Sequence, residues 1–313
     1  MIPKDVTRRR FLKTAAAVAG TTVPGLSAAP EGSNARVSFG FSLYGMRSLS
    51  VARALRECAT IGYDGVELVA TKGWPCDPQA LARNHRRDIR KQLADTGLQV
   101  SALMENLRLV VDAKTNRGNL DRLKRAAELG HEVSPKNPPV IETVLGGRPK
   151  QWDALKGKMA TALEGWAKAA EAARTVVAVK AHVGGALHHS KDARKLVESV
   201  GSRWIRLAYD YSHFQLWDET LDDSLKTAVD RTVFIHVKDS KGKRGKFRFL
   251  LPGEGSIDYA KYFALLKRYR YGGPLVVEVS GQIHGRKGYD PIAAAKTSYA
   301  NLATKLKAAG LRG

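Results

Sequence analysis

Two stretches decide the fold of this chain: Arg206-Leu207-Ala208-Tyr209-Asp210-Tyr211-Ser212-His213-Phe214 and Phe234-Ile235-His236-Val237-Lys238-Asp239. Each begins as an apolar strand and ends in acidic, imidazole or ammonium side chains. The segment between them is long enough for one helix. Because barrel active sites lie at the C-terminal ends of the strands, two consecutive strands with such endings indicate neighbouring β/α units of a barrel.

The rest of the chain repeats this alternation of apolar strands and amphipathic helices. Eight strands are predicted, at residues 37–44, 62–69, 97–104, 138–145, 176–182, 205–210, 233–237 and 274–279. Helices are predicted after them, at residues 50–61, 78–94, 119–129, 152–174, 191–200, 221–229, 259–269 and 291–309. Eight such units predict a (β/α)8 TIM barrel. A doubly wound open sheet is the alternative, although no glycine-rich phosphate-binding loop follows the first strand.

The first 29 residues have the pattern of an export signal. Thr7-Arg8-Arg9-Arg10-Phe11-Leu12-Lys13 matches the twin-arginine motif, and an apolar stretch then leads to the small-residue cleavage site Leu26-Ser27-Ala28-Ala29. That stretch is too short to span a bilayer, which takes about 20 residues. We therefore expect a signal peptide at residues 1–29, a linker at 30–36 and a barrel at 37–313. The twin-arginine translocase would deliver the folded protein to the periplasm or the medium.

Composition sets further bounds on the protein. With 313 residues, 43% of them hydrophobic, the chain can build one large core without a disulfide framework. Cys58 and Cys76 are expected to be free thiols. The formal net charge is +22, and about +18 remains without residues 1–29. Because an exported protein rarely meets DNA, we expect no nucleic-acid partner and interpret the charge as a basic surface. Residues 241–248 are expected to form an exposed basic loop over the barrel mouth.

Polar side chains gather where the predicted strands end. They are Glu67, Lys180, His182, Asp210, His213, His236, Lys238, Asp239 and Glu278, and Glu142 joins them from the middle of its strand rather than from its tip. A carboxylate flanked by apolar residues, such as Glu278, is costly to bury unless it is paired or bound to a metal. Any single one could form an internal ion pair. So many on successive strands favour an active site at the mouth of the barrel.

Five segments together resemble the xylose-isomerase-like TIM barrels, which include sugar isomerases, ketose epimerases, inositol-catabolic enzymes and apurinic endonucleases. They are Gly62-Tyr63-Asp64-Gly65-Val66-Glu67, Tyr209-Asp210-Tyr211-Ser212-His213, Ile235-His236-Val237-Lys238-Asp239, Gly253-Glu254-Gly255-Ser256-Ile257-Asp258-Tyr259 and Val276-Val277-Glu278. The resemblance implies a divalent metal held by Glu, Asp, His and Glu from strands five to eight. Asp210, His236 and Glu278 match the last three ligands. The family's fifth strand carries Glu-x-His, where this chain has Lys180-Ala181-His182.

Lys180 cannot replace the missing carboxylate ligand, because a protonated amine has no lone pair and carries charge of the metal's own sign. Three hypotheses follow. Glu142 supplies the fourth ligand for Mn²⁺, Mg²⁺, Zn²⁺ or Co²⁺, and Lys180 acts as a general acid or base. Alternatively, the Lys180 ammonium itself replaces the metal among the carboxylates. In the third hypothesis the site is inactive and only binds.

We expect an exported carbohydrate-active enzyme of the isomerase or epimerase type. It would move a proton next to a carbonyl of a small sugar or keto-sugar, through an enediolate stabilised by a metal or by the fifth-strand lysine. His182 and His213 are expected to bind substrate or transfer protons. Glu67, Lys238 and Asp239 are expected to bind the sugar, with an internal Lys238–Asp239 ion pair as an equal alternative. A keto-sugar lyase and a non-catalytic sugar-binding barrel are the alternative functions; an apurinic endonuclease would need a richer cluster of metal ligands.

Overall fold

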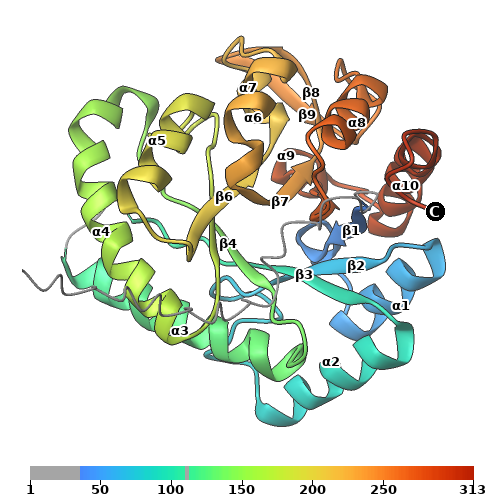
Figure 1. Cartoon of the computed structure of the whole chain (residues 1–313). Helices are drawn as coiled ribbons and strands as arrows, with labels where there is room; N and C mark the ends of the chain where they lie inside the picture. Colours follow the sequence, from blue (N-terminus) through green and yellow to red (C-terminus); the bar gives the residue numbers. More distant parts are fainter. Residues whose placement is uncertain (1–35, 110–112) are drawn as a thin grey trace, which may run out of the picture.

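The computed structural model describes residues 36–109 and 113–313. The predicted signal peptide and all but the last residue of the predicted linker lie outside the described residues. The described residues form a closed barrel of parallel strands with helices around it (Figure 1). The TIM-barrel prediction is therefore confirmed. A doubly wound sheet is excluded, because its two edge strands would remain unpaired.

The barrel wall consists of eight strands, each of which coincides with a predicted strand to within a few residues. They are β1 (Ser38–Ser42), β2 (Gly65–Val69), β3 (Gln99–Met104), β4 (Val140–Val144), β5 (Val177–Lys180), β6 (Ile205–Tyr209), β7 (Thr232–Val237) and β10 (Pro274–Val277). Around the barrel they follow the order β1-β10-β7-β6-β5-β4-β3-β2. Every neighbouring pair is parallel, so all eight C-terminal ends open on the same face.

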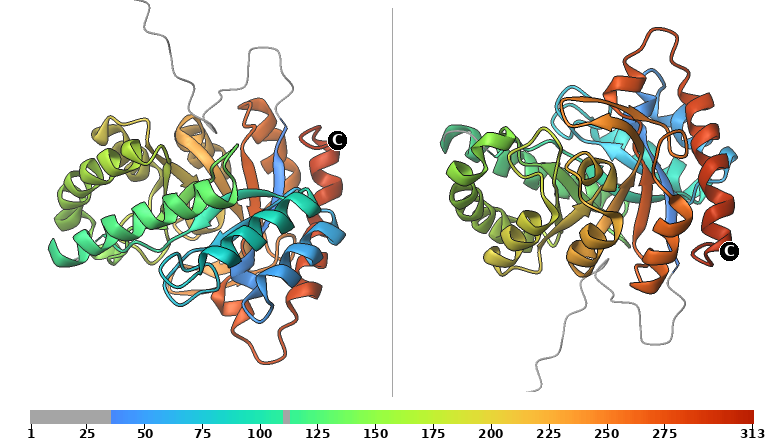
Figure 2. Two further views of the ribbon diagram at one scale, coloured as in Figure 1. Left: turned by 90° about the horizontal axis from the view of Figure 1, so that it is seen from below. Right: turned by 90° about the horizontal axis from the view of Figure 1, so that it is seen from above.

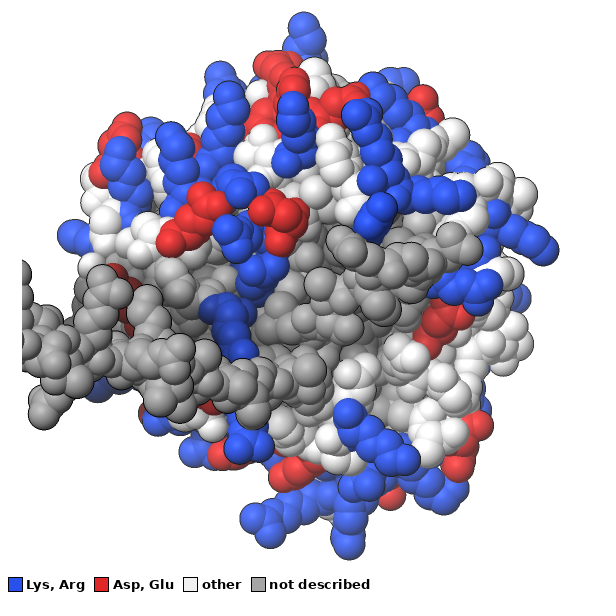
Figure 3. Space-filling model, in the orientation of Figure 1, with Lys and Arg blue, Asp and Glu red and all other residues white. Residues whose placement is uncertain are grey.

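Helices cover the outside of the barrel (Figure 2). They are α1 (Val51–Ile61), α2 (Arg83–Thr96), α3 (Ala113–Val133), α4 (Trp152–Ala172), α5 (Ser190–Val200), α6 (Tyr211–Gln215), α7 (Leu221–Ala228), α8 (Tyr259–Arg268), α9 (Gly281–His284) and α10 (Pro291–Ala308). None of the helices in the described part of the chain is both long enough and apolar enough to cross a bilayer. Lys and Arg side chains are scattered over the face drawn in Figure 3 rather than gathered in one block.

Three predicted helix boundaries and one predicted loop were wrong. Helix α2 begins at Arg83 instead of residue 78, because Asp77 folds the preceding segment into turns by accepting hydrogen bonds from the N–H groups of Gly73 and Gln79. Helix α3 starts earlier than predicted and ends at Val133. Residues 241–248 belong to an antiparallel hairpin of β8 (Asp239–Lys243) and β9 (Lys246–Leu250).

The β8–β9 hairpin covers one side of the barrel mouth. Its Phe249 is buried, with the ring 5.2 Å from the His213 ring and 5.1 Å from Lys238 Nζ. The Phe249 N–H also donates to Gln282 in α9 at 2.8 Å. Because apolar burial and hydrogen bonding anchor one strand of it, the hairpin is part of the folded structure despite its exposed basic tip.

A small apolar layer closes the barrel beneath its polar end. It consists of Ala102, Ala178, Ala208, Phe234 and Val276, one from each of five strands. Four small or branched side chains leave room for the single large ring of Phe234, which is fully buried. The barrel interior is therefore packed at this level, as TIM barrels require, and any cavity must lie above it.

Gly65, the first residue of β2, allows the wall to close tightly at this level. A Cβ atom there would lie 2.7 Å from Ser101 Oγ and 2.9 Å from the Gln99 carbonyl oxygen of β3. Gly65→Ala is therefore expected to lower the free energy of unfolding by about 1–3 kcal/mol, as overpacking against backbone does. Urea denaturation measures this loss. Gly157→Ala in α4, where a Cβ meets nothing within 4 Å, is the matched control and should stabilise by about 0.5–1 kcal/mol. Equal effects at the two positions would contradict the argument.

Candidate functional site

The polar end of the barrel follows from the alternation of side chains along the strands. Residues two positions apart share a face, so the second residue after each one in the apolar layer also points inward. This places four polar side chains in the next layer: Lys180 after Ala178, Asp210 after Ala208, His236 after Phe234, and Glu278 after Val276. All four are drawn from predicted site residues, and they converge above the apolar layer.

Lys180 lies at the centre of this layer and is 4% exposed. Its Nζ is 3.2 Å from Glu278 Oε2, 2.9 Å from His236 Nδ1 and 3.0 Å from Glu142 Oε1. The contact with Glu142 is close enough for an ion pair but is not aligned as a hydrogen bond. The three N–H bonds of the ammonium thus face three acceptor atoms from three different strands or strand ends.

His236 is fully buried and contacts an acceptor or donor on each side of its ring. Nε2 lies 3.0 Å from Glu67 Oε2, while Nδ1 faces Lys180 and lies 3.2 Å from Glu278 Oε2. Burial lowers the pKa of His236, but Glu67 and Glu278 outweigh burial and Lys180 and raise it to about 9. A second proton on the ring nevertheless conflicts with the 2.9 Å contact to Lys180, which needs one lone pair. The Nδ1 lone pair therefore accepts from Lys180, and Nε2–H donates to Glu67.

Lys238 is the second buried ammonium of the site. Its Nζ contacts Asp210 Oδ2 and lies 2.8 Å from Glu278 Oε2. The other oxygen of Asp210 accepts from the Ser212 N–H at 3.1 Å and from its hydroxyl at 2.6 Å. Asp210 and Glu278 are thus bridged by Lys238, and the predicted Lys238–Asp239 ion pair does not form.

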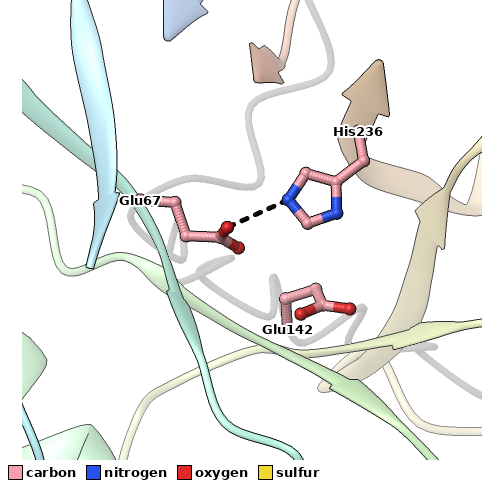
Figure 4. A group of neighbouring side chains, drawn as sticks. All are labelled: Glu67, Glu142 and His236. Carbon is pink, nitrogen blue, oxygen red and sulfur yellow. Dashed lines mark hydrogen bonds and ion pairs between the residues drawn. The ribbon is translucent and has the colours of Figure 1, made fainter. Parts of the chain in front are cut away.

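Glu67 and Glu142 lie deeper, in the middle of β2 and β4. In Figure 4 the Glu67 carboxylate faces Nε2 of His236, and the Glu142 carboxylate turns toward the same space. The Ser42 hydroxyl donates to Glu67 Oε2. Glu67 Oε1 and both oxygens of Glu142 have no hydrogen-bond partner among the described residues. Burial raises the pKa of Glu142 although Lys180 opposes the shift, so Glu142 keeps its proton to higher pH than an exposed glutamate.

The electrostatics of Lys180 and Glu278 favour their charged forms. Burial alone would lower the pKa of Lys180, but Glu142, Glu278 and Asp210 raise it above its usual range. Burial alone would raise the pKa of Glu278, yet Lys180 and Lys238 hold it well below its usual range. A lysine ammonium and a glutamate carboxylate therefore persist side by side in the site at neutral pH.

A cavity of about 470 Å³ opens above this layer, at the C-terminal ends of the strands. Its lining includes Lys180, His182 and Glu278 from the predicted site. The other predicted residues, Glu67, Glu142, Asp210, His213, His236, Lys238 and Asp239, do not line it. A ligand in the cavity thus meets Lys180 and Glu278 directly, and the deeper charges act through these two.

His182 and His213 have different surroundings. Burial, with Lys180 and Lys238, lowers the pKa of His182 to about 4, so the ring is neutral. Its Nδ1 accepts the Gly184 N–H at 3.1 Å, which leaves the proton on Nε2. His213 is fully buried, its Nδ1 accepts the Val183 N–H at 3.4 Å, and its Nε2 lies 3.5 Å from Asp210. His182 can serve a ligand as a hydrogen-bond donor, whereas His213 positions Asp210 and the segment after β5.

Asp239 was predicted to bind the sugar, but its contacts are structural. Its two oxygens accept backbone N–H groups of Ser240, Gly253 and Ile257 at 3.0–3.1 Å. The side chain is fully buried and does not line the cavity. Asp239 therefore holds the segment after the β8–β9 hairpin against the barrel.

Two groups of residues offer metal-ligating atoms within 4.8 Å of one another. They are Glu67, Glu142 and His236, and Asp210, His236 and Glu278. The chemistry of both sets suits a divalent ion, but as they lie they do not fit one. Lys180 contacts members of both sets, and Lys238 bridges Asp210 and Glu278. A divalent ion about 4 Å from an ammonium would be repelled by roughly 8 kcal/mol at an effective dielectric constant of about 20.

Sequence reasoning missed four polar residues that line the cavity: Tyr44, Asn106, Arg108 and Arg148. All four lie in the connections that follow β1, β3 or β4, so closeness to a strand end is the one sequence signal that could have marked them. Tyr44 packs edge-on against His284, with ring centroids 4.6 Å apart. Burial and Glu278 raise the pKa of Tyr44, so its hydroxyl remains a proton donor.

A closed eight-stranded barrel with a charged cluster at its C-terminal end defines the class of TIM barrels that build their sites from strand ends. The sequence profile of the family described as xylose isomerase-like TIM barrel matches residues 55–304. This chain therefore belongs to the xylose isomerase-like TIM barrel family, as its motifs predicted.

Curated relatives are similar to parts of the chain. L-ribulose-5-phosphate 3-epimerase UlaE of Salmonella paratyphi C (strain RKS4594) is 32% identical over 26% of this chain and 28% of its own length. Inosose dehydratase of Bacillus velezensis is 27% identical over 40% of this chain and 44% of its own length. These relatives include an epimerase and a dehydratase, and the matches span less than half the length of each.

Solved structures resemble the barrel over most of its length. The apo form of 3-keto-D-glucoside 4-epimerase YcjR from E. coli has a TM-score of 0.69 and 18% identity, covering 86% of this chain and 100% of its own. The IolI protein with a bound zinc atom has a TM-score of 0.73 and 17% identity, covering 86% and 99%. At this level of identity the likeness establishes the fold alone.

Proposed function

We propose that this protein is a sugar isomerase or epimerase that transfers a proton next to a carbonyl group. The observation that carries the proposal is the floor of the cavity, where the Lys180 ammonium and the Glu278 carboxylate lie 3.2 Å apart. One can stabilise a developing oxyanion and the other can accept a proton from carbon. The epimerases among the curated relatives support this class of reaction.

In the proposed mechanism the substrate carbonyl oxygen accepts hydrogen bonds from Lys180 and from Nε2–H of His182. Glu278 removes the proton from the adjacent carbon, and the charge moves to the oxygen held by the two donors. Because Lys180 turns an N–H from Glu278 to the substrate, Glu278 loses part of an ion pair and becomes a stronger base. In an epimerisation Glu278 returns the proton to the same carbon and the carbonyl re-forms. In an isomerisation the proton goes to the former carbonyl carbon, and the neighbouring hydroxyl passes its proton to the former carbonyl oxygen. Tyr44, which also lines the cavity, can donate to a substrate oxygen.

No step of this mechanism requires a metal. Mn²⁺, Mg²⁺, Zn²⁺ or Co²⁺ would suit the donor atoms of Asp210, His236 and Glu278 if Lys180 moved away, and such an ion would then supply the same oxyanion stabilisation. With the lysine in place, we assign that role to its ammonium.

Solvent exchange tests the proposed reaction without knowledge of the final product. The protein is incubated in D₂O with a panel of ketoses and keto-glycosides, and loss of the proton next to the carbonyl is followed by ¹H NMR. Exchange with a rearranged sugar supports the isomerase or epimerase. Exchange with a new double bond points to the keto-sugar lyase. Binding without exchange of any compound in the panel would leave only the sugar-binding barrel and overturn the proposed function.

The wall of the cavity favours a substrate with an anionic group. Arg108 and Arg148 line it, and both side chains are exposed. A substrate phosphate or carboxylate could accept charge-assisted hydrogen bonds from both. Arg108→Ser with Arg148→Ser is expected to raise KM for an anionic sugar about 10- to 100-fold and to leave kcat nearly unchanged.

Steady-state kinetics on matched neutral, carboxylated and phosphorylated sugars measure this preference. Arg90→Ser, which removes an exposed arginine from α2, is the control for the change in net charge. If KM rises equally for neutral and anionic sugars, the two arginines do not select for an anionic substrate.

We also propose that the protein is exported by the twin-arginine translocase. Arg8, Arg9 and Arg10 support this, together with the short apolar stretch and the small residues that follow. Replacing all three arginines by lysine should keep the protein in the cytoplasm, as measured by cell fractionation. Unchanged delivery to the periplasm would contradict a twin-arginine route.

A further inference from the structure

We propose that the Lys180 ammonium occupies the place of the divalent ion in this barrel, so that one substitution, Lys180→Glu, converts it into a metal site. The inference concerns the same site as the proposed proton transfer. Its readout is metal binding, so either proposal can fail without the other.

Lys180 lies beside the candidate metal ligands in the barrel wall. Lys180 ends β5, beside Asp210 after β6, His236 in β7 and Glu278 after β10. These four residues come from strands that are neighbours in the barrel. Lys180 pairs in register with Ala208, which lies two residues before Asp210. A side chain at position 180 is thereby directed at the space that Asp210, His236 and Glu278 enclose.

The contacts of Lys180 Nζ are those that a bound cation would make. The atoms that would ligate a cation already face an ammonium: His236 Nδ1 and Glu278 Oε2 lie 2.9 and 3.2 Å from Lys180 Nζ. The lone pair of His236 Nδ1 points at Lys180 because Nε2–H donates to Glu67. Removing Lys180 therefore frees the nitrogen ligand of His236 in an orientation that a cation already stabilises. Glu278 Oε2 loses one of its two ammonium partners and keeps only Lys238, at 2.8 Å.

The charge of the site depends on the residue at position 180. Glu142, whose oxygens have no hydrogen-bond partner among the described residues, balances the positive charge of Lys180. Exchanging the ammonium for a carboxylate shifts the site by two negative charges, which a divalent ion would neutralise. The uncharged replacement Lys180→Gln adds an oxygen ligand and shifts the site by one charge only. Metal affinity should thus increase from the wild type to Lys180→Gln and further to Lys180→Glu.

The experiment measures metal content and metal binding in the purified full-length protein. After chelator treatment, Mn²⁺ binding is followed by isothermal titration calorimetry, and Co²⁺ binding by the visible absorption of the coordinated ion. We expect less than one tenth of an equivalent in the wild type and about one equivalent in Lys180→Glu. Affinity should rise by at least about 100-fold over the wild type, which is the upper range for supporting residues around a metal.

Lys195→Glu is the matched control, because it makes the same charge change at an exposed position of α5 and should bind no more metal than the wild type. If Lys180→Glu does not fold, metal binding is measured in Lys180→Gln, for which a smaller increase in affinity is expected. A wild type that binds one equivalent of Mn²⁺ or Co²⁺ in the barrel overturns the proposal. Folded variants that bind no more metal than Lys195→Glu overturn it equally.

Discussion

Lys180→Met is expected to lower the rate of substrate proton exchange by about 100- to 1,000-fold, the loss found when one oxyanion-stabilising group is removed. Methionine keeps an unbranched side chain of similar length and removes the charge. The substrate oxygen would then develop its charge without the ammonium that lies 3.2 Å from Glu278. Exchange measured by ¹H NMR in D₂O under single-turnover conditions reports the loss directly.

The decrease should appear in kcat more than in KM, since the ammonium meets its full negative charge only as the enediolate forms. Lys195→Met serves as the control for loss of a lysine at an exposed position. Denaturation of both variants shows whether Lys180→Met remains folded. Folded Lys180→Met that exchanges within threefold of the wild type would contradict the assigned role.

The barrel could be predicted from the sequence because two regular patterns repeat along it. Apolar strands that alternate with amphipathic helices leave few architectures, and glycines such as Gly62 mark the helix ends. Gly62 ends α1 with φ 105°, a conformation that favours glycine. The β8–β9 hairpin was missed because its polar, basic strands resemble a loop in composition. Buried Phe249 is what fixes the hairpin, and that contact is not visible in sequence.

The strand-end rule found the centre of the site but could not assign partners within it. Lys238 and Asp239 were weighed as an ion pair, yet adjacent residues at the end of a strand point to opposite sides. Lys238 accordingly enters the barrel to meet Asp210, while Asp239 turns to backbone N–H groups. Alternation alone could have excluded that pair.

The walls of the cavity were harder to predict. Arg108 and Arg148 lie in connections after β3 and β4, where no periodic pattern sets the direction of a side chain. Glu142 could be placed inside the barrel by alternation. Its position in the middle of the predicted strand indicated a deeper place. The register confirms this, because it pairs Glu142 with Ala178 of the apolar layer rather than with Lys180. Whether Glu142 serves as a fourth metal ligand or faces the Lys180 ammonium depends on that depth.

Lys238→Met is expected to lower the free energy of unfolding by about 3–5 kcal/mol at neutral pH, the cost of breaking a buried ion pair by removing one partner. The ammonium is fully buried and contacts Asp210 and Glu278. Without it, Asp210 keeps only the N–H and hydroxyl of Ser212 as close donors, because His213 Nε2 lies 3.5 Å away. Urea denaturation at pH 7 measures the loss.

The pH dependence gives this prediction a second, independent test. Burial alone would raise the pKa of Glu278, but Lys180 and Lys238 hold it well below its usual range. A depressed pKa contributes stability that is present above the unfolded value of about 4.3 and is lost as the pH falls through the folded value. Lys238→Met removes one of the two ammonium groups that lower the pKa of Glu278, so the variant loses part of this stabilisation. The difference in the free energy of unfolding between wild type and variant should therefore narrow as the pH falls below about 4.3.

Removing both partners separates the ion pair from simple packing. Asp210→Asn with Lys238→Met leaves no uncompensated charge at position 210, so the double variant should be more stable than the sum of the two single losses implies. A coupling energy of about 0.5–3 kcal/mol is expected for residues in direct contact. Strictly additive losses, or a Lys238→Met variant that loses less than about 1 kcal/mol, would show that the buried lysine stabilises the barrel through its hydrocarbon chain alone.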